Sequence, residues 1–265
     1  MTSEKSAVSD GTQHPDEGHQ QQAGPQEIRD AFDALESDLS RLEVAVREFE
    51  GAPRDELESD GEQDTRIRPT RDEFETAAGR LQDLLAELNG GHGAINSHSG
   101  GTITPLDPEP AAINLDDIAH ALSNLCRFTG HGKRVHSVAR HAVHVSHEVE
   151  ARGGSLSAQR WGLLHDASEA YLADVPAPVK QTLPGYMHAE LRLQRVVRDA
   201  FGIDLAIEDE RLVDAADSAI GRAELAAYFP QCEFTAPVLE YPRADLDQDT
   251  DAMSLFLSRA EALGL

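Results

Sequence analysis

From Asn114 onward, apolar residues recur at helical three- and four-residue steps, and no stretch alternates between apolar and polar residues as a half-buried strand does. Asn114 is a residue type that caps helices, and apolar residues follow it on one face from Ile118 to Leu125. Further helices are expected at 134–151, 157–172, 186–201, 208–229 and about 250–263. The pattern predicts that residues 94–265 form an all-α domain.

The region before residue 94 follows a different pattern. Residues 1–25 are polar and rich in Gly, Pro and Gln, which predicts a disordered acidic tail. Residues 26–93 hold two heptad seams, 28–49 and 74–88, with an acidic linker between them. The seams predict a helical hairpin or a coiled coil that would make a homo-oligomer, and an acidic arm with loosely formed helices explains them equally well. Residues 92–113 are expected to be a linker and entry segment.

The chain is strongly acidic, with 48 Asp+Glu against 23 Lys+Arg and a formal net charge of −25. Acids predominate both before and after residue 94, and lysine is scarce. This composition is typical of halophilic proteins, and it argues against nucleic-acid polymers and anionic membranes as partners. No apolar run is long enough to span a membrane, and the first residues lack the apolar core of a secretory signal. Two cysteines give no disulfide framework, which indicates a cytoplasmic protein.

Three polar points interrupt the apolar helix faces: His141, the adjacent pair His165 and Asp166, and Asp217. Each alone has an ordinary explanation as a surface or satisfied core group. The pair is harder to explain in this way, because it directly follows two leucines and should lie beside the core. Buried charge is costly unless it is paired or bound to metal. Imidazole and carboxylate together suit one divalent ion such as Mn²⁺, Co²⁺, Mg²⁺, Fe²⁺ or Zn²⁺. Asp214, one turn before Asp217, is a rival for the fourth ligand.

His141, His165 and Asp166 lie within a series of five motifs that precede Asp217: Asp117–Ser123 (DIAHALS), Arg127–His131 (RFTGH), Ser137–His141 (SVARH), Leu163–Tyr171 (LLHDASEAY) and Asp174–Lys180 (DVPAPVK). In this order the motifs resemble the HD-domain metal-dependent phosphohydrolases, and most of all their bacterial 5′-deoxynucleotidase branch. The resemblance covers about half of the chain, from residue 94 to about residue 230. It implies that residues 94–265 form an HD phosphohydrolase domain of the helical-bundle type.

The resemblance also implies a role for each matching residue. It makes His141, His165, Asp166 and Asp217 the metal ligands. It makes Glu169 the acid/base carboxylate and Asp174 a carboxylate that positions substrate or water. It makes Arg127 and Lys180 the two cations that bind phosphate. Dinuclear members of the superfamily have further histidines between the His-Asp pair and the last aspartate. This chain has only His188 there, so a single ion is expected.

The expected activity is hydrolysis of a phosphate monoester of a small metabolite, a (deoxy)nucleoside 5′-monophosphate, by metal-activated water. Two alternatives stay open. The same centre could hydrolyse a signalling nucleotide diphosphate or a cyclic phosphodiester. The domain could also serve a regulatory or assembly protein that uses its N-terminal helices.

The remaining histidines of the region are expected outside the metal centre. His144 and His147 follow His141 at three-residue steps, and each is interpreted as a surface residue or, less simply, as a rival ligand. His120 is interpreted as structural. His131 and His136 are interpreted as residues of the site's rim.

Overall fold

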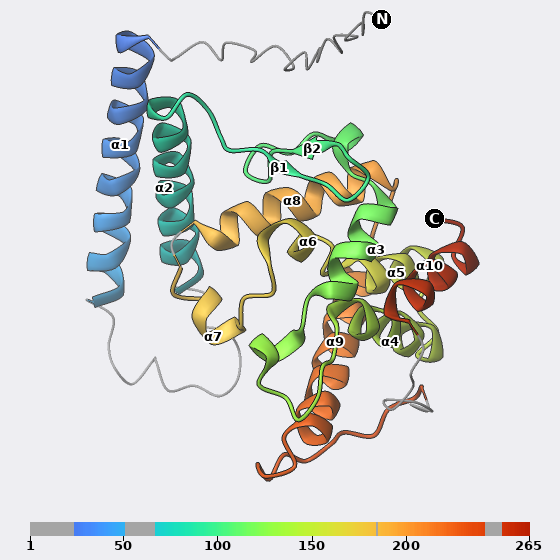
Figure 1. Ribbon diagram of the computed structural model, residues 1–265. Coiled ribbons are helices and arrows are strands. Elements are labelled where there is room, and N and C mark those ends of the chain that lie inside the picture. The colour runs from blue at the N-terminus through green and yellow to red at the C-terminus, as the bar shows by residue number, and fades with distance from the viewer. Residues whose placement is uncertain (1–23, 51–66, 184, 242–250) are drawn as a thin grey trace, which may run out of the picture.

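The computed structural model describes residues 24–50, 67–183, 185–241 and 251–265, and this part of the chain is mostly helical (Figure 1). Its helices are α1 (Pro25–Glu50), α2 (Ile67–Leu88), α3 (Leu115–Asn124), α4 (Val138–Ala151), α5 (Leu156–Leu164), α6 (Glu169–Leu172), α7 (Ala177–Lys180), α8 (Tyr186–Ala200), α9 (Ile207–Tyr228) and α10 (Ala252–Ala262). Two 3₁₀ turns, η2 (Pro110–Ala112) and η3 (Arg127–Gly130), lie before and after α3. The all-α prediction is confirmed.

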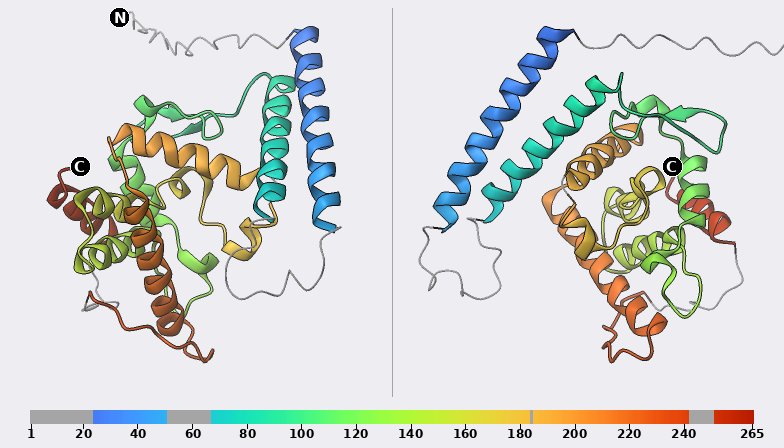
Figure 2. Two further views of the ribbon diagram at one scale, coloured as in Figure 1. Left: turned by 180° about the vertical axis from the view of Figure 1, so that it is seen from behind. Right: turned by 60° about the vertical axis from the view of Figure 1, so that its left-hand side comes forward.

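Helix α4 is the centre of the core. It packs against α3, α5, α9 and α10, and its apolar residues, such as Val138, Ala142 and Val145, are fully buried. The last helix, α10, closes the bundle by packing Phe256 and Ala260 against this core. Figure 2 shows α4, α5 and α9 gathered on one side of the molecule, away from α1 and α2. Because α4 and α9 touch directly, side chains on their facing surfaces can meet.

Helices α1 and α2 form an antiparallel hairpin at the edge of the molecule, and α2 in turn packs on α8 (Figures 1 and 2). Ala77 and Leu84 of α2 are buried. The buried carboxylate of Asp38 on α1 forms an ion pair with Arg80 on α2, which ties the two helices together. Both segments that carry a heptad seam are therefore helical in the described residues.

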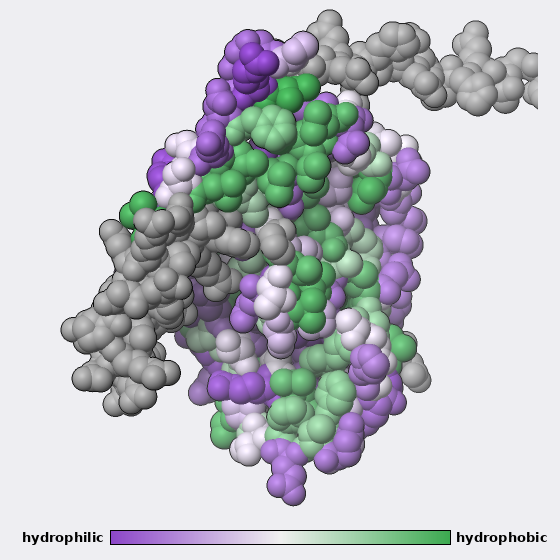
Figure 3. All heavy atoms as spheres, turned by 90° about the vertical axis from the view of Figure 1, so that its left-hand side faces the viewer, coloured by the Kyte–Doolittle hydropathy of each residue, from purple (hydrophilic) through white to green (hydrophobic). Residues whose placement is uncertain are grey.

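The outer face of this hairpin keeps several heptad residues in contact with solvent. About half of each side chain is exposed at Phe32, Leu39, Leu81, Leu85 and Leu88. Figure 3 shows apolar side chains gathered on this side of the molecule. The seams are therefore only partly covered within one chain.

One expectation about local structure is wrong. Residues 157–172 are not one helix, because α5 ends at Leu164 and a turn over 165–168 separates it from α6. The expected linker at 92–113 contains a short antiparallel hairpin, β1 (Ile95–Asn96) and β2 (Thr102–Ile103), with Ile95 opposite Ile103. Strands of two residues are too short to show alternation in a sequence.

The expected acidic tail and acidic linker lie largely outside the described residues, which begin at residue 24 and omit 51–66. Among the helices that are described, none combines the length and the apolar character that crossing a bilayer requires.

Candidate metal centre

Four side chains from three parts of the fold converge at one point. His141 lies on α4, His165 and Asp166 lie in the turn after α5, and Asp217 lies on α9. Asp217 Oδ1 is 3.0 Å from His141 Nε2 and 3.8 Å from His165 Nε2. Asp166 approaches the same two nitrogens, at 3.6 Å from His141 and 3.3 Å from His165. These are the four residues that the resemblance assigns as metal ligands.

The spacing of these atoms suits a metal ion. Bonds of about 2.1 Å put neighbouring ligand atoms about 3.0 Å apart around an octahedral ion and about 3.4 Å apart around a tetrahedral one. One ligand atom from each of His141, His165 and Asp166 lies within 4.8 Å of the others. The Nε2 atoms of both histidines are buried and take part in no hydrogen bond of suitable geometry. The donor set and its unsatisfied nitrogens therefore fit a divalent cation.

His165 and Asp166 reach the same point although they are adjacent in the chain, in the break between α5 and α6. On an unbroken helix, adjacent side chains diverge by about 100°. In the turn, the N–H of Ala167 donates to Leu164 and that of Glu169 donates to Asp166, so the backbone tightens around the pair. The two side chains nevertheless approach each other, with His165 Nε2 3.3 Å from Asp166 Oδ1, so both can reach one ion.

A hydrogen bond on the far side of each imidazole sets its orientation. His165 Nδ1 is 3.0 Å from the carbonyl oxygen of Gly162, and His141 Nδ1 is 3.0 Å from a carboxylate oxygen of Glu224. A carbonyl oxygen only accepts, so His165 Nδ1 must carry a proton and Nε2 is the free ligand atom. Both rings thus turn Nε2 toward Asp166 and Asp217.

The centre opens to solvent on the carboxylate side. Asp217 is 42% exposed and Asp166 is 18% exposed, whereas His141 is fully buried. Burial and Arg127 oppose a charge on His141, but the carboxylates of Glu224 and Asp217 outweigh them and raise its pKa to about 9. Burial opposes a charge on Asp217, but the two nearby imidazoles outweigh burial and lower its pKa. The site therefore attracts positive charge and leaves room for water or substrate.

Asp214, the rival ligand, is exposed one turn earlier on α9. Its pKa is raised, first by burial and then by the charge of Asp217. It is Asp217 that the structure brings to the two imidazoles.

Arg127 lies beside the centre on a strained turn. It begins η3, and the two residues after it, Phe128 and Thr129, have φ of +59° and +50°. Its guanidinium group lies 3.1 Å from Glu224 Oε2 and 3.6 Å from Asp166 Oδ2. Burial opposes its charge, but the carboxylates, Glu224 first, outweigh burial and raise its pKa. Arg127 is therefore a permanently charged cation next to the candidate ligands.

Glu169, Asp174 and Lys180 form a second group beside the centre. Glu169 begins α6 and is buried, and burial followed by the charges of Asp166 and Asp174 raises its pKa to about 10. Lys180 Nζ lies 3.8 Å from Glu169 and forms a short ion pair with Glu190. Asp174 is partly buried, and burial raises its pKa. Its surroundings therefore favour the protonated form of Glu169, and Lys180 contacts both Glu169 and Glu190.

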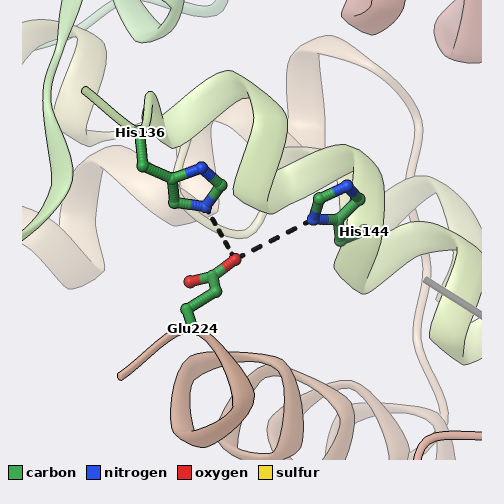
Figure 4. A group of neighbouring side chains, drawn as sticks. All are labelled: His136, His144 and Glu224. Carbon is green, nitrogen blue, oxygen red and sulfur yellow. Dashed lines mark hydrogen bonds and ion pairs between the residues drawn. The ribbon is translucent and has the colours of Figure 1, made fainter. Parts of the chain in front are cut away.

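Glu224 is the site residue that the sequence analysis missed. It lies seven residues after Asp217 on α9, is fully buried, and forms a cluster with His136 and His144 (Figure 4). His136 Nε2 is 2.9 Å from Glu224 Oε1, and His144 Nδ1 is 3.9 Å from the same oxygen. The sequence carries one signal for Glu224, which is its spacing from Asp217. Seven residues span two helical turns, so Glu224 lies on the same face of α9 as Asp217, two turns further along the helix.

The expectations for His136 and His144 are wrong. His144 is 8% exposed and His136 is 2% exposed, so neither is a surface or rim residue. His147 is half-buried and stacks on the ring of Tyr241. His131 is exposed. His120 stacks on His98, with ring centroids 3.6 Å apart, which fits the structural role expected for it.

Comparisons with known proteins place the chain among bacterial relatives. No protein-family model matches it. It is 37% identical to "Uncharacterized protein RCAP_rcc00048" of Rhodobacter capsulatus over 145 residues, which span 51% of this chain and 74% of the relative. It is 43% identical to "Uncharacterized protein YfdR" of Escherichia coli over 91 residues, which span 34% of this chain and 48% of YfdR. The chain belongs to the family of RCAP_rcc00048, and it matches about half the length of YfdR.

Proposed function

We propose that this chain is a metal-dependent phosphohydrolase that cleaves a phosphate monoester of a small metabolite, a (deoxy)nucleoside 5′-monophosphate. One observation carries the proposal. Two buried imidazole nitrogens meet two partly exposed carboxylates, His141 and His165 facing Asp166 and Asp217, with a partly buried arginine beside them. A closed structural metal site would not keep an exposed side or need a cation next to it.

A divalent ion held by these four side chains would lower the pKa of a water molecule and polarise a phosphoryl oxygen. The residues around the ion supply the rest. Arg127 offers N–H groups in a planar fork, which matches the oxygens of a phosphate. In so acidic a protein, this positive charge offsets the repulsion that a substrate phosphate would otherwise meet. Asp174 lies near enough to Arg127 for the two charges to interact, and it would position substrate or water.

Glu169 is suited to act as the general acid. Burial and the charges of Asp166 and Asp174 raise its pKa, which favours the protonated form, and Lys180 lies 3.8 Å from its carboxyl group. In the proposed reaction, water attacks phosphorus and the ester P–O bond breaks. The leaving oxygen takes the proton of Glu169 and becomes an alcohol. Lys180 would stabilise the carboxylate that remains. One proton of the attacking water stays on the inorganic phosphate, and the other returns to Glu169.

The choice of a nucleoside monophosphate rests on the resemblance of the five motifs to the 5′-deoxynucleotidase branch. The same centre would also support hydrolysis of a signalling nucleotide diphosphate or a cyclic phosphodiester. These substrates give different products, so a panel that includes them separates the three reactions.

The test is a matrix of metals and substrates on the purified chain, at low and at molar salt. We expect phosphate release from a nucleoside 5′-monophosphate with at least one of Mn²⁺, Co²⁺, Mg²⁺, Fe²⁺ or Zn²⁺. Asp166→Ala should abolish both metal binding and turnover, because it removes a ligand. Glu169→Gln should keep metal binding and lower kcat by about 10²–10⁴-fold, the usual contribution of a general acid. Full activity in Asp166→Ala would overturn the proposal.

A further inference from the structure

We propose that Glu224 is the positioning residue of this centre: its buried carboxylate aims both the metal ligand His141 and the phosphate-binding Arg127. The inference rests on the proposed function and deepens it. Glu224 does not face the point where the four candidate ligands meet. It lies behind His141, on the α9 face that packs against α4.

Glu224 fixes which nitrogen of His141 is offered to a metal. Nδ1 lies 3.0 Å from Oε2 and 3.2 Å from Oε1, so both carboxylate oxygens face the same ring nitrogen. A carboxylate accepts a hydrogen bond from this nitrogen's N–H, which leaves Nε2 as the nitrogen that faces Asp217. Carboxylates that hold metal-binding histidines in this way orient the ring and make it a better ligand.

The same carboxylate also fixes Arg127. Arg127 Nε is 3.1 Å from Oε2, the oxygen that lies nearest to His141 Nδ1. The contact is an ion pair without hydrogen-bond geometry at Nε, and Nη1 of the same guanidinium group lies 3.6 Å from Asp166 Oδ2. Because a single oxygen contacts both side chains, rotation of Glu224 would misplace the ligand and the arginine together.

Neighbouring side chains hold the carboxylate against such rotation. His136 Nε2 lies 2.9 Å from Oε1, and the hydroxyl of Tyr228 lies 3.0 Å from His136 Nδ1 (Figure 4 shows His136 and Glu224). His136, His144 and Glu224 also come close enough together to hold a second cation. The positioning role explains more of the contacts, because the oxygens of Glu224 already face His136, His141 and Arg127.

The experiment measures metal affinity directly, without substrate, by titrating the purified full chain with Mn²⁺ and counting bound ions. Glu224→Gln keeps the shape but removes the carboxylate. Glu148→Gln is the matched control, because Glu148 is equally buried and bonds Arg152 and backbone N–H groups away from the centre. We expect the Kd for Mn²⁺ to rise 10–100-fold in Glu224→Gln, the usual effect of removing such a partner, and to stay unchanged in Glu148→Gln.

Glu224→Asp keeps the charge and shortens the side chain. It therefore still tests the inference if Glu224→Gln does not fold. Its Kd for Mn²⁺ should also rise, by less than in Glu224→Gln. Inorganic phosphate should inhibit both variants less strongly than it inhibits the parent chain, because Arg127 loses its anchor. The control variant should be inhibited as the parent is.

Two results would overturn the inference. A folded Glu224 variant with the parent's Kd would make the residue merely structural. A parent that binds two ions, one of which is lost in Glu224→Gln while the other binds as before, would make the cluster a second metal site. Failure of the proposed function is separate: it would show as unchanged Mn²⁺ binding in His165→Ala or Asp166→Ala.

Discussion

Backbone strain collects next to the candidate site residues. Among the described residues other than glycine, positive φ occurs at Phe128, Thr129 and Ala173. The first two follow Arg127, and the third precedes Asp174. Such conformations cost about 1–3 kcal/mol each and persist only where the surroundings impose them. Each strained point therefore lies directly beside a residue that the proposed reaction uses, Arg127 or Asp174.

Ala173 gives the sharpest test of this strain. Its φ of +68° and ψ of 159° lie in a region that glycine adopts freely and alanine does not. Ala173→Gly should therefore raise the free energy of unfolding by about 1 kcal/mol, after the added freedom of the unfolded chain is subtracted. Ala170→Gly, inside α6, should lower it by about 1 kcal/mol. Chemical denaturation measures both, and a loss of stability in Ala173→Gly would contradict the strain.

The candidate ligands could be singled out from the sequence because each is a polar residue placed against an apolar helix face. Glu224 could not, because acids are common throughout this chain and its importance depends on α9 packing against α4. His144 was misjudged for the same reason. Its burial comes from the packing of α4 between other helices, and one helix's own pattern does not contain that information.

The start of α4, the helix that carries His141, is held by hydrogen bonds of its first residues. Ser137 caps α4 by accepting a hydrogen bond from the N–H of Arg140, 3.3 Å away. It also pairs with Cys126 in an isolated bridge, and Arg127 donates its N–H to His136 at 2.8 Å. The start of α4 is therefore joined to the turn that carries Arg127.

Removing this cap should affect both stability and turnover. Ser137→Ala should cost about 1 kcal/mol of stability, the usual value for a lost N-cap, and should reduce activity because the start of α4 loosens. Ser155→Ala removes the cap of α5, whose hydroxyl accepts from Ala158, and should cost a similar amount with little change in kcat. Thermal unfolding and kcat are measured on both variants. Equal kcat values would show that the cap does not support the site.

The positions of most helices could be predicted from periodicity, but the break inside 157–172 could not. Both α5 and α6 carry apolar residues in the same phase, so the pattern continues across the turn at 165–168. The most important local feature of the site was therefore hidden in a pattern that looks regular.

The molecule as a whole combines a large negative net charge with exposed apolar side chains. The net charge of −25 covers both parts of the chain, and the hairpin of α1 and α2 exposes leucines such as Leu81 and Leu85. The expectation that this hairpin assembles copies of the protein stays a prediction. Self-association of so acidic a surface would in any case need salt, because like charges must approach each other.

Salt should stabilise the protein itself. Forty-eight acids against 23 bases repel one another in the compact state more than in the unfolded chain. The range of this repulsion falls from about 10 Å at 0.1 M salt to about 3 Å at 1 M. We therefore expect Tm at pH 7 to rise by several degrees between 0.1 and 2 M KCl.

The isoelectric point supplies the control for this prediction. Near pH 4.7 the chain carries no net charge, so screening should add little stability there. A rise in Tm of equal size at pH 7 and near pH 4.7 would mean that KCl acts by strengthening apolar burial instead. A Tm at pH 7 that stays flat or falls with KCl would show that self-repulsion does not limit this fold, and that its acidity is not an adaptation to salt.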